Sequence, residues 1–94
     1  MKCSEFLGKK GWCKNVSARD EDGEPCNRTR KVPVSFCALG VIGEVTKNVA
    51  EYIRISNLLE AKITEKFGVI TVTYNDTICQ NKEELIALFK EIGE

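Results

Sequence analysis

The spacing of apolar residues predicts that much of this chain is helical. Near the C-terminus, four apolar residues follow the i, i+3, i+4, i+7 spacing of an amphipathic helix: Leu85, Leu88, Phe89 and Ile92. Asn81 and Glu84 precede them at the spacing of an N-terminal capping box. We expect this last helix to pack its apolar stripe on a sheet.

Two further helices are predicted in the middle of the chain. One runs from Phe36 to about Thr46, with Ser35 as its cap and with Gly40 and Gly43 on one face. A glycine inside a helix costs about 1 kcal/mol relative to alanine. The pair therefore indicates that another backbone packs closely on this face.

The next helix begins with the Asn48 and Glu51 capping pattern and extends to Lys66, with Ser56-Asn57 as a candidate break. Gly68 ends the helical pattern. Residues 69–74 are β-branched almost throughout and predict a strand that ends at Asn75-Asp76.

The N-terminal third is more polar. A short helix is predicted from Lys2 to Lys10, with Gly11 as its left-handed stop. Asp22-Gly23 favours a tight turn in a hairpin or an ordered loop. A basic stretch within residues 26–34 predicts an exposed loop that would attract an acidic surface or a phosphate locally; it contains Arg28, Arg30 and Lys31.

These elements predict one α+β domain over residues 1–94, with three to four helices packed on a small antiparallel sheet or hairpin. A chain of 94 residues is too short for two cores. With 43% hydrophobic residues it has enough apolar material for one core.

The charge balance limits the classes of partner. Fourteen Lys and Arg residues offset fourteen Asp and Glu residues, so general nucleic-acid binding by counterion release is not expected. No apolar run approaches the roughly 20 residues of a membrane-spanning helix. The N-terminus also lacks the apolar stretch of a secretory signal, so we expect a cytoplasmic protein without membrane contact.

The cysteines do not predict a metal site or a disulfide framework. They are scattered and odd in number, and the chain has no histidine: Cys3, Cys13, Cys26, Cys37 and Cys79. The carboxylates around Gly23 resemble part of a calcium loop, but Lys31 stands at the twelfth position counted from Asp20. We expect no metal and no cofactor, and we interpret the cysteines as small apolar residues.

Cys37 is the candidate nucleophile. It is predicted in the first turn of its helix, where the helix dipole favours the thiolate. Without histidine, the base would have to be Asp20, Asp76 or a lysine. The alternative is a small buried residue beside an aromatic ring.

Polar residues that could contact a ligand or partner lie elsewhere. Asn75 and Asp76 follow the predicted strand, where side chains either meet ligands or cap the turn. Arg19 can bind a carboxylate or phosphate with its guanidinium, or pair internally with Asp20 or Asp76. Trp12 is interpreted as a core residue rather than a stacking platform.

Short motifs in a fixed order give the chain a resemblance to a known family. They are Gly11-Trp12, Ala18-Arg19-Asp20 with Gly23, Phe36-Cys37-Ala38-Leu39-Gly40, Tyr74-Asn75-Asp76 and Glu84. This order resembles a family of small bacterial and bacteriophage proteins of unknown function. Its members carry Gly-Trp, Ala-Arg-Asp-x-x-Gly, Trp-Cys-Ala-x-Gly and Trp-Asn-Asp.

The chain departs from the family pattern at several of these positions. Phe36 and Tyr74 replace the family's tryptophans, and Gln80-Asn81 replaces a common Arg-Thr pair. The missing arginine argues against an anionic ligand shared with the family.

Three hypotheses of function follow. The leading one is a non-catalytic binding protein, bacterial or phage-encoded, that contacts a protein partner or a small polar ligand. Its candidate contact residues are Arg19, Asp20, Cys37, Asn75 and Asp76. A phage origin would make a component of host defence a plausible target. The alternatives are a thiol-dependent hydrolase or transferase using Cys37, and a homodimer closed by the glycine face of the central helix.

Overall fold

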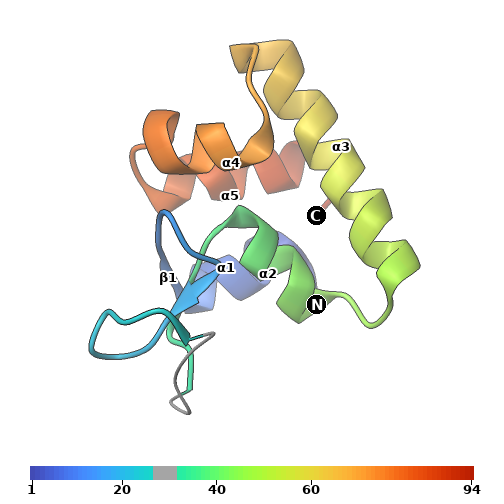
Figure 1. The fold of residues 1–94 in the computed structure, drawn as a ribbon. Helices are drawn as coiled ribbons and strands as arrows, with labels where there is room; N and C mark the ends of the chain where they lie inside the picture. The colour runs from blue at the N-terminus through green and yellow to red at the C-terminus, as the bar shows by residue number, and fades with distance from the viewer. Residues whose placement is uncertain (27–31) are drawn as a thin grey trace.

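The computed structural model describes residues 1–26 and 32–94. In chain order the elements are α1 (Cys3–Lys9), β1 (Gly11–Trp12), β2 (Ala18–Arg19), β3 (Ser35–Phe36), α2 (Ala38–Val45), α3 (Val49–Phe67), α4 (Thr71–Thr73), the π-helical turn η2 (Tyr74–Ile78) and α5 (Lys82–Glu91) (Figure 1). The predicted α+β class is confirmed. The loop expected at Arg28, Arg30 and Lys31 lies outside the described residues.

The sheet is very small and mixed, where an antiparallel sheet or hairpin was expected. Its strand order is β1-β3-β2, with β1 parallel and β2 antiparallel to the central β3. Phe36 pairs with Trp12 on one side and with Ala18 on the other. The sheet thus joins three separate segments of the N-terminal part of the chain.

The turn predicted at Asp22-Gly23 is confirmed. The Asp20 N–H donates to the Glu24 carbonyl at 2.9 Å, and the Gly23 N–H donates to the Asp20 carbonyl at 3.0 Å. Gly23 has a φ of 82°, which glycine adopts without steric cost.

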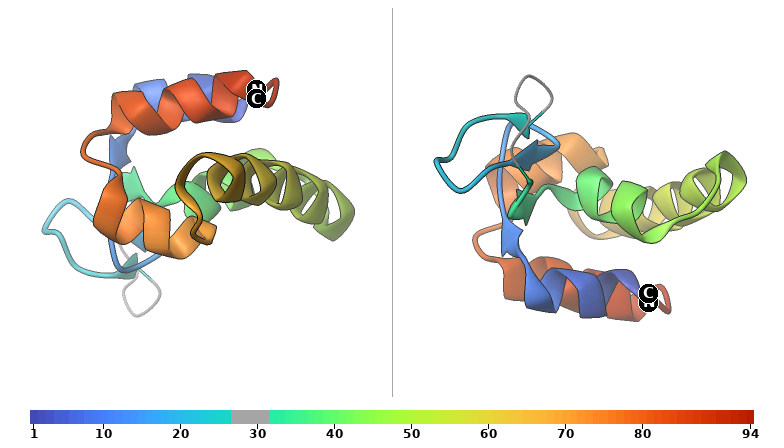
Figure 2. Two further views of the ribbon diagram at one scale, coloured as in Figure 1. Left: turned by 90° about the horizontal axis from the view of Figure 1, so that it is seen from above. Right: turned by 90° about the horizontal axis from the view of Figure 1, so that it is seen from below.

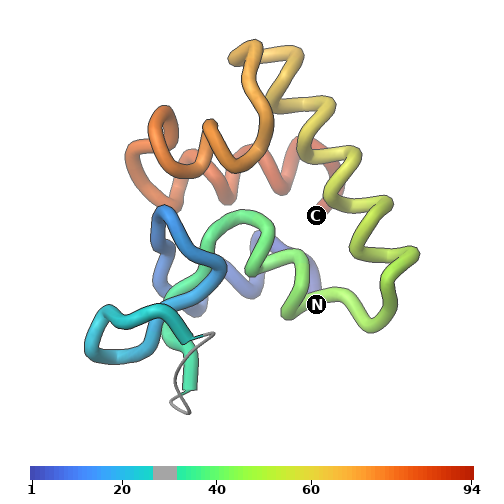
Figure 3. Tube along the Cα trace, in the orientation of Figure 1, coloured from blue at the N-terminus to red at the C-terminus, as the bar shows by residue number. Residues whose placement is uncertain are grey.

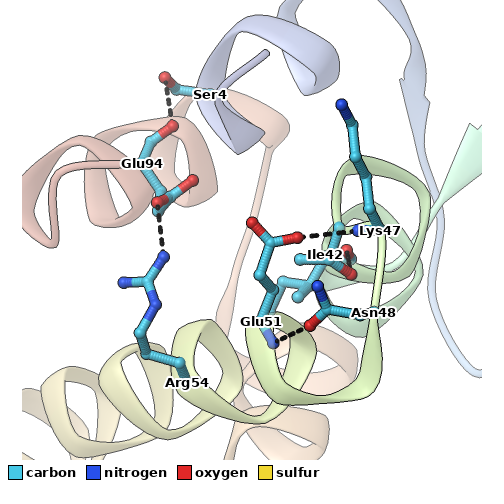
Figure 4. Close-up of polar contacts among 8 residues, drawn as sticks. Ser4, Ile42, Lys47, Asn48, Glu51, Arg54 and Glu94 are labelled. Carbon is cyan, nitrogen blue, oxygen red and sulfur yellow. Dashed lines mark hydrogen bonds and ion pairs between the residues drawn. The ribbon is translucent and has the colours of Figure 1, made fainter.

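Helix α5 packs chiefly against α1 and α3, not mainly on the sheet as predicted. Figure 2 shows α1 and α5 side by side, with the two chain ends close together. The predicted stripe is buried as expected at Leu85, Leu88 and Phe89. The Ser4 N–H and hydroxyl both donate to the Glu94 carbonyl, at 2.8 and 2.9 Å, and tie the C-terminal residue to α1 (Figure 4).

Helix α3 is continuous, so the candidate break at Ser56-Asn57 is wrong; Figure 3 traces it without interruption. The side chain of Asn48 caps it by accepting the Glu51 N–H at 2.9 Å, as predicted. Glu51 in turn accepts the Lys47 N–H at 3.0 Å (Figure 4). Gly68 ends the helix with a φ of 72°. None of the described helices is both long and apolar enough to cross a membrane.

The strand predicted over residues 69–74 is wrong, because this segment is helical from Thr71 onward and Ile70 is the N-cap. Ile70 and Val72 are 57% and 49% exposed, whereas Thr71 and Tyr74 are buried. Buried positions three residues apart fit a helix and would fall on opposite faces of a strand. Packing has therefore overridden the β-propensity of the branched side chains.

Helix α2 begins later than predicted. Ser35 belongs to β3, and the cap is Cys37, whose sulfur accepts the Gly40 N–H at 3.4 Å. A Cβ on Gly40 would collide with the Ser17 carbonyl oxygen, so the predicted close backbone approach is confirmed there. Gly43 has only the Tyr52 ring nearby, 3.9 Å from where a Cβ would lie.

Gly11 has a different role from the predicted helix stop. Lys10 ends α1 in an extended conformation, and Gly11 lies in β1. A Cβ on Gly11 would be 3.1 Å from the Cβ of Ser35, which is tighter than almost all real contacts. Gly11 therefore allows β1 to approach β3 closely.

The two glycines of α2 give a matched test of this packing. We expect Gly40→Ala to lower the free energy of unfolding by about 1–3 kcal/mol, because the new methyl overpacks against Ser17. Gly43→Ala should instead raise it by about 0.5–1 kcal/mol, because it removes a helix-interior glycine without a clash. Urea unfolding of both variants measures this, and a Gly40→Ala protein as stable as the wild type would contradict the packing.

Candidate functional site

The amide of Asn75 holds three parts of the fold together. Its Oδ1 accepts the Trp12 indole N–H at 2.8 Å and the Ala38 backbone N–H at 3.0 Å. Its Nδ2 donates to the Cys13 carbonyl at 3.1 Å and to Asp76 Oδ1 at 2.9 Å. Two acceptor positions and two donors are the full capacity of an amide, so this side chain, 2% exposed, is completely satisfied.

Asp76 extends the same network to the N-terminal loop. Its Oδ1 accepts the Asn15 N–H at 2.8 Å as well as the Asn75 amide. Asn15 has a φ of 72°, and asparagine is one of the residues that tolerate this left-handed conformation. No group of the described residues bonds the other carboxylate oxygen of Asp76, Oδ2.

Both residues belong to the π-helical turn η2. The Cys79 N–H closes this turn by donating to the Tyr74 carbonyl at 2.8 Å. The Tyr74 ring is buried and lies 4.8 Å from the Phe67 ring, which anchors the turn to the end of α3. Single π turns within helices occur frequently at functional sites.

Cys37 faces the same region from the start of α2. It is the N-cap itself, whereas the sequence predicted the first turn. Its N–H donates to the Ser17 carbonyl at 3.0 Å, and its sulfur accepts the Gly40 N–H. The thiol residue is partly exposed.

These segments enclose a pocket of about 160 Å³, which we call the Asp76 pocket. It is lined by Asn15, Val16, Ser17, Cys37, Ala38, Leu39, Thr71, Val72, Asn75 and Asp76. Three of the predicted contact residues, Cys37, Asn75 and Asp76, therefore converge. Among these lining residues Asp76 carries the only charged side chain.

Thr71 gives this pocket an unusual feature. The residue is 2% exposed, and its hydroxyl has no hydrogen-bond partner in the described part of the chain. Buried hydroxyls are normally paired, because an unpaired one costs about 1–3 kcal/mol.

Arg19 and Asp20 do not line the pocket. Arg19 donates to the carbonyls of Gly23 and Lys14, at 2.8 and 3.0 Å, and not to Asp20 or Asp76 as predicted. The buried Asp20 carboxylate accepts the N–H groups of Asp22 and Glu24, at 2.9 and 3.1 Å. Both side chains shape the hairpin.

Three of the other thiols are buried. Burial, with the nearby Glu94 carboxylate as the next cause, raises the pKa of Cys3 to about 12. Burial also raises the pKa of Cys13 and of Cys79. These three thiols stay protonated at neutral pH. In the described ranges, no three Cys, Asp or Glu side chains gather into a group that could hold a metal ion.

A larger hollow of about 390 Å³ lies near the chain ends. Its carboxylates already have partners within the protein. Glu5 accepts the Lys2 N–H, Glu51 accepts the Lys47 N–H, and Glu94 pairs with Arg54 at 3.9 Å. The Asp76 pocket differs because its lining contains one carboxylate and no basic residue, whereas Lys2, Lys47 and Arg54 line the larger hollow together with its glutamates.

Several lining residues were not predicted from the sequence. Thr71 and Val72 lay in the supposed strand, and Asn15, Val16 and Leu39 carry no motif for binding. Thr71 could have been placed beside Asn75 only if residues 71–78 had been predicted as helical, because residues four apart lie on the same face of a helix.

No family model, curated protein or solved structure matches this chain.

The Asn75 network can be tested by removing its amide. We expect Asn75→Ala to lower the free energy of unfolding by about 3 kcal/mol, because Trp12, Ala38 and Cys13 each lose a buried partner. It should also shift the fluorescence of Trp12, the one tryptophan in the chain.

Asn57→Ala, at an exposed position of α3, is the matched control and should leave both quantities nearly unchanged. Equal urea midpoints for Asn75→Ala and the wild type would contradict the network.

Proposed function

We propose that this chain is a non-catalytic binding protein whose contact site is the Asp76 pocket. One observation carries this proposal: the pocket wall is fixed by the fully bonded Asn75 amide, yet it keeps unpaired polar atoms on Asp76 and Thr71. A preformed pocket of apolar walls with a few polar groups is typical of binding sites. Rigid walls also reduce the entropy lost on binding.

The second candidate function is a thiol-dependent hydrolase or transferase using Cys37. The Cys37 sulfur accepts the Gly40 N–H at the start of α2, and the residue lines the Asp76 pocket. The described lining residues include no lysine or arginine. The lining therefore lacks a cation that would stabilise either the thiolate or an oxyanion, which favours binding over catalysis.

We further propose a bacterial or phage origin and a cytoplasmic location. The family resemblance supports the origin, and two residues of its separate motifs, Trp12 and Asn75, are hydrogen-bonded to each other. Cys3, Cys13, Cys37 and Cys79 form no disulfide, which fits a reducing compartment. We include a component of host defence as the target in this proposal, and only the proposed phage origin supports it.

The partner remains a protein or a small polar ligand in this proposal. The balanced charge of the chain disfavours nucleic acid as a general partner. The homodimer through the glycine face stays a prediction, although Gly40 already packs on Ser17 of the same chain.

The pocket proposal is tested by blocking the pocket mouth. Val72 lines the pocket and is half exposed, so Val72→Arg should close it without disturbing the core. Ile70→Arg changes an equally exposed residue outside the lining and is the matched control. Each protein is purified from its own host cells and measured by native mass spectrometry. We expect the wild type and Ile70→Arg to carry the additional mass of a bound ligand or partner, and Val72→Arg to lack it. The same bound mass on Val72→Arg would contradict the proposal.

The thiol alternative is tested by alkylation. We expect Cys37 to react with iodoacetamide at pH 7 no faster than glutathione does, as followed by peptide mass spectrometry with Cys37→Ser as the control for peptide assignment. Glutathione is the comparator because Cys3 and Cys79 are slow through burial alone. A rate more than about tenfold above glutathione would favour the thiol enzyme instead.

A further inference from the structure

The unpaired atoms of the Asp76 pocket indicate what kind of ligand it takes. Asp76 Oδ1 is occupied by Asn15 and Asn75, whereas Oδ2 has no partner in residues 1–26 and 32–94. An ionised carboxylate accepts hydrogen bonds only, so a ligand group that meets Oδ2 must be a donor. A cationic donor gives the stronger, charge-assisted bond.

No cation among the described residues answers the charge of Asp76 at the pocket wall. The described lining residues contain neither lysine nor arginine. Lys14, which precedes Asn15 of the lining, is placed over the Trp12 ring, with its Nζ 5.2 Å from the ring centroid. Arg19 is held by the carbonyls of the hairpin. Within residues 1–26 and 32–94, the negative charge of Asp76 is thus left for a ligand.

The rest of the lining is suited to an aliphatic stem. Val16, Ala38, Leu39 and Val72 provide apolar walls. Long cationic side chains and alkylamines bury their methylene groups on such surfaces while the charged end keeps its hydrogen bonds.

Thr71 is a further uncommon feature of the lining. Its hydroxyl is buried without a partner in the described part of the chain, although the residue lines the pocket. The hydroxyl oxygen exposes almost no surface, so a ligand in the pocket does not reach it. Asp76 therefore remains the acceptor for the ligand.

We infer that the Asp76 pocket binds an alkylammonium or guanidinium group on an aliphatic stem, with Asp76 Oδ2 as its acceptor. This inference rests on the proposed binding function and specifies its ligand class. The group has two sources, a free amine or a lysine or arginine side chain of a protein partner.

The inference is tested by titrating ¹⁵N-labelled protein with n-butylammonium, n-propylguanidinium, n-butanol and butyrate. We expect the two cations alone to give saturable NMR shifts at residues 15–17, 37–39 and 71–76. Equal shifts with n-butanol would overturn the cation preference and leave the pocket as a binding site. No shift with any probe would overturn the inference, while the Val72→Arg comparison still decides the proposed function separately.

Asp76→Asn isolates the free oxygen. The amide oxygen of the new side chain still accepts from Asn15 and Asn75, so the fold keeps its contacts while Oδ2 becomes an uncharged donor. We expect at least a tenfold weaker affinity for n-butylammonium. Glu83→Gln removes the same charge from an exposed position of α5 and should leave the affinity unchanged. An unchanged affinity in Asp76→Asn would overturn the inference.

Thr71→Val separates the charge of Asp76 from the polarity of the wall. Replacing an unpaired buried hydroxyl by a methyl group should raise the melting temperature. It should leave n-butylammonium binding unchanged, because Asp76 Oδ2 is the acceptor. A loss of affinity as large as that of Asp76→Asn would overturn this assignment.

The source of the cation is decided by two blocked peptides, acetyl-Gly-Lys-Gly-amide and its acetyl-lysine analogue. Binding of the lysine peptide alone supports a partner side chain. Binding of n-butylammonium without the peptide supports a free amine.

Discussion

The fold around the pocket depends on one buried amide. Asn75 bonds the indole of Trp12, the backbone of Cys13 and the first residue of α2, and the last two of these bonds are buried. Because a single side chain satisfies all of them, the N-terminal segment, α2 and the π turn can meet only in one arrangement. The positions of Asp76, Cys37 and Thr71 follow from that arrangement.

The hydrogen bonds of Asn75 also explain why the pocket exists before a ligand binds and is not filled by side chains of the protein. Gly40 lets α2 approach Ser17, and the left-handed Asn15 turns its N–H toward Asp76. These contacts fix residues of the pocket wall, while the Thr71 hydroxyl and one Asp76 oxygen have no partner among the described residues. The protein thereby gives up some stability at this position, a trade that is common where a surface has to bind.

The sequence predicts the parts of this fold that local signals specify. Helices α3 and α5 follow from apolar periodicity and from the Asn48 and Asn81 caps, and the hairpin turn follows from Asp22-Gly23. The segment of residues 69–74 was wrongly predicted as a strand. Its β-branched residues favour a strand locally, whereas burial of Thr71 and Tyr74 requires a helix.

The site was predictable only as a set of scattered candidates. Asn75 lies 63 residues from Trp12 and 37 from Ala38, so no local pattern could show that one amide serves both. For the same reason, a carboxylate was predicted as the internal partner of Arg19. In the structure, Arg19 donates to backbone carbonyls of its own hairpin.

Hydrogen exchange of the Trp12 indole N–H tests the central claim most directly. The chain has one tryptophan, so its indole proton gives one resolved NMR signal. If the Asn75 network keeps the empty pocket in the shape that binds a ligand, the indole proton exchanges only when the whole protein unfolds. The free energy of its exchange then equals the free energy of unfolding measured in urea. Exchange as fast as that of exposed loop amides would show that the Asn75 network opens locally and that the pocket is not preformed.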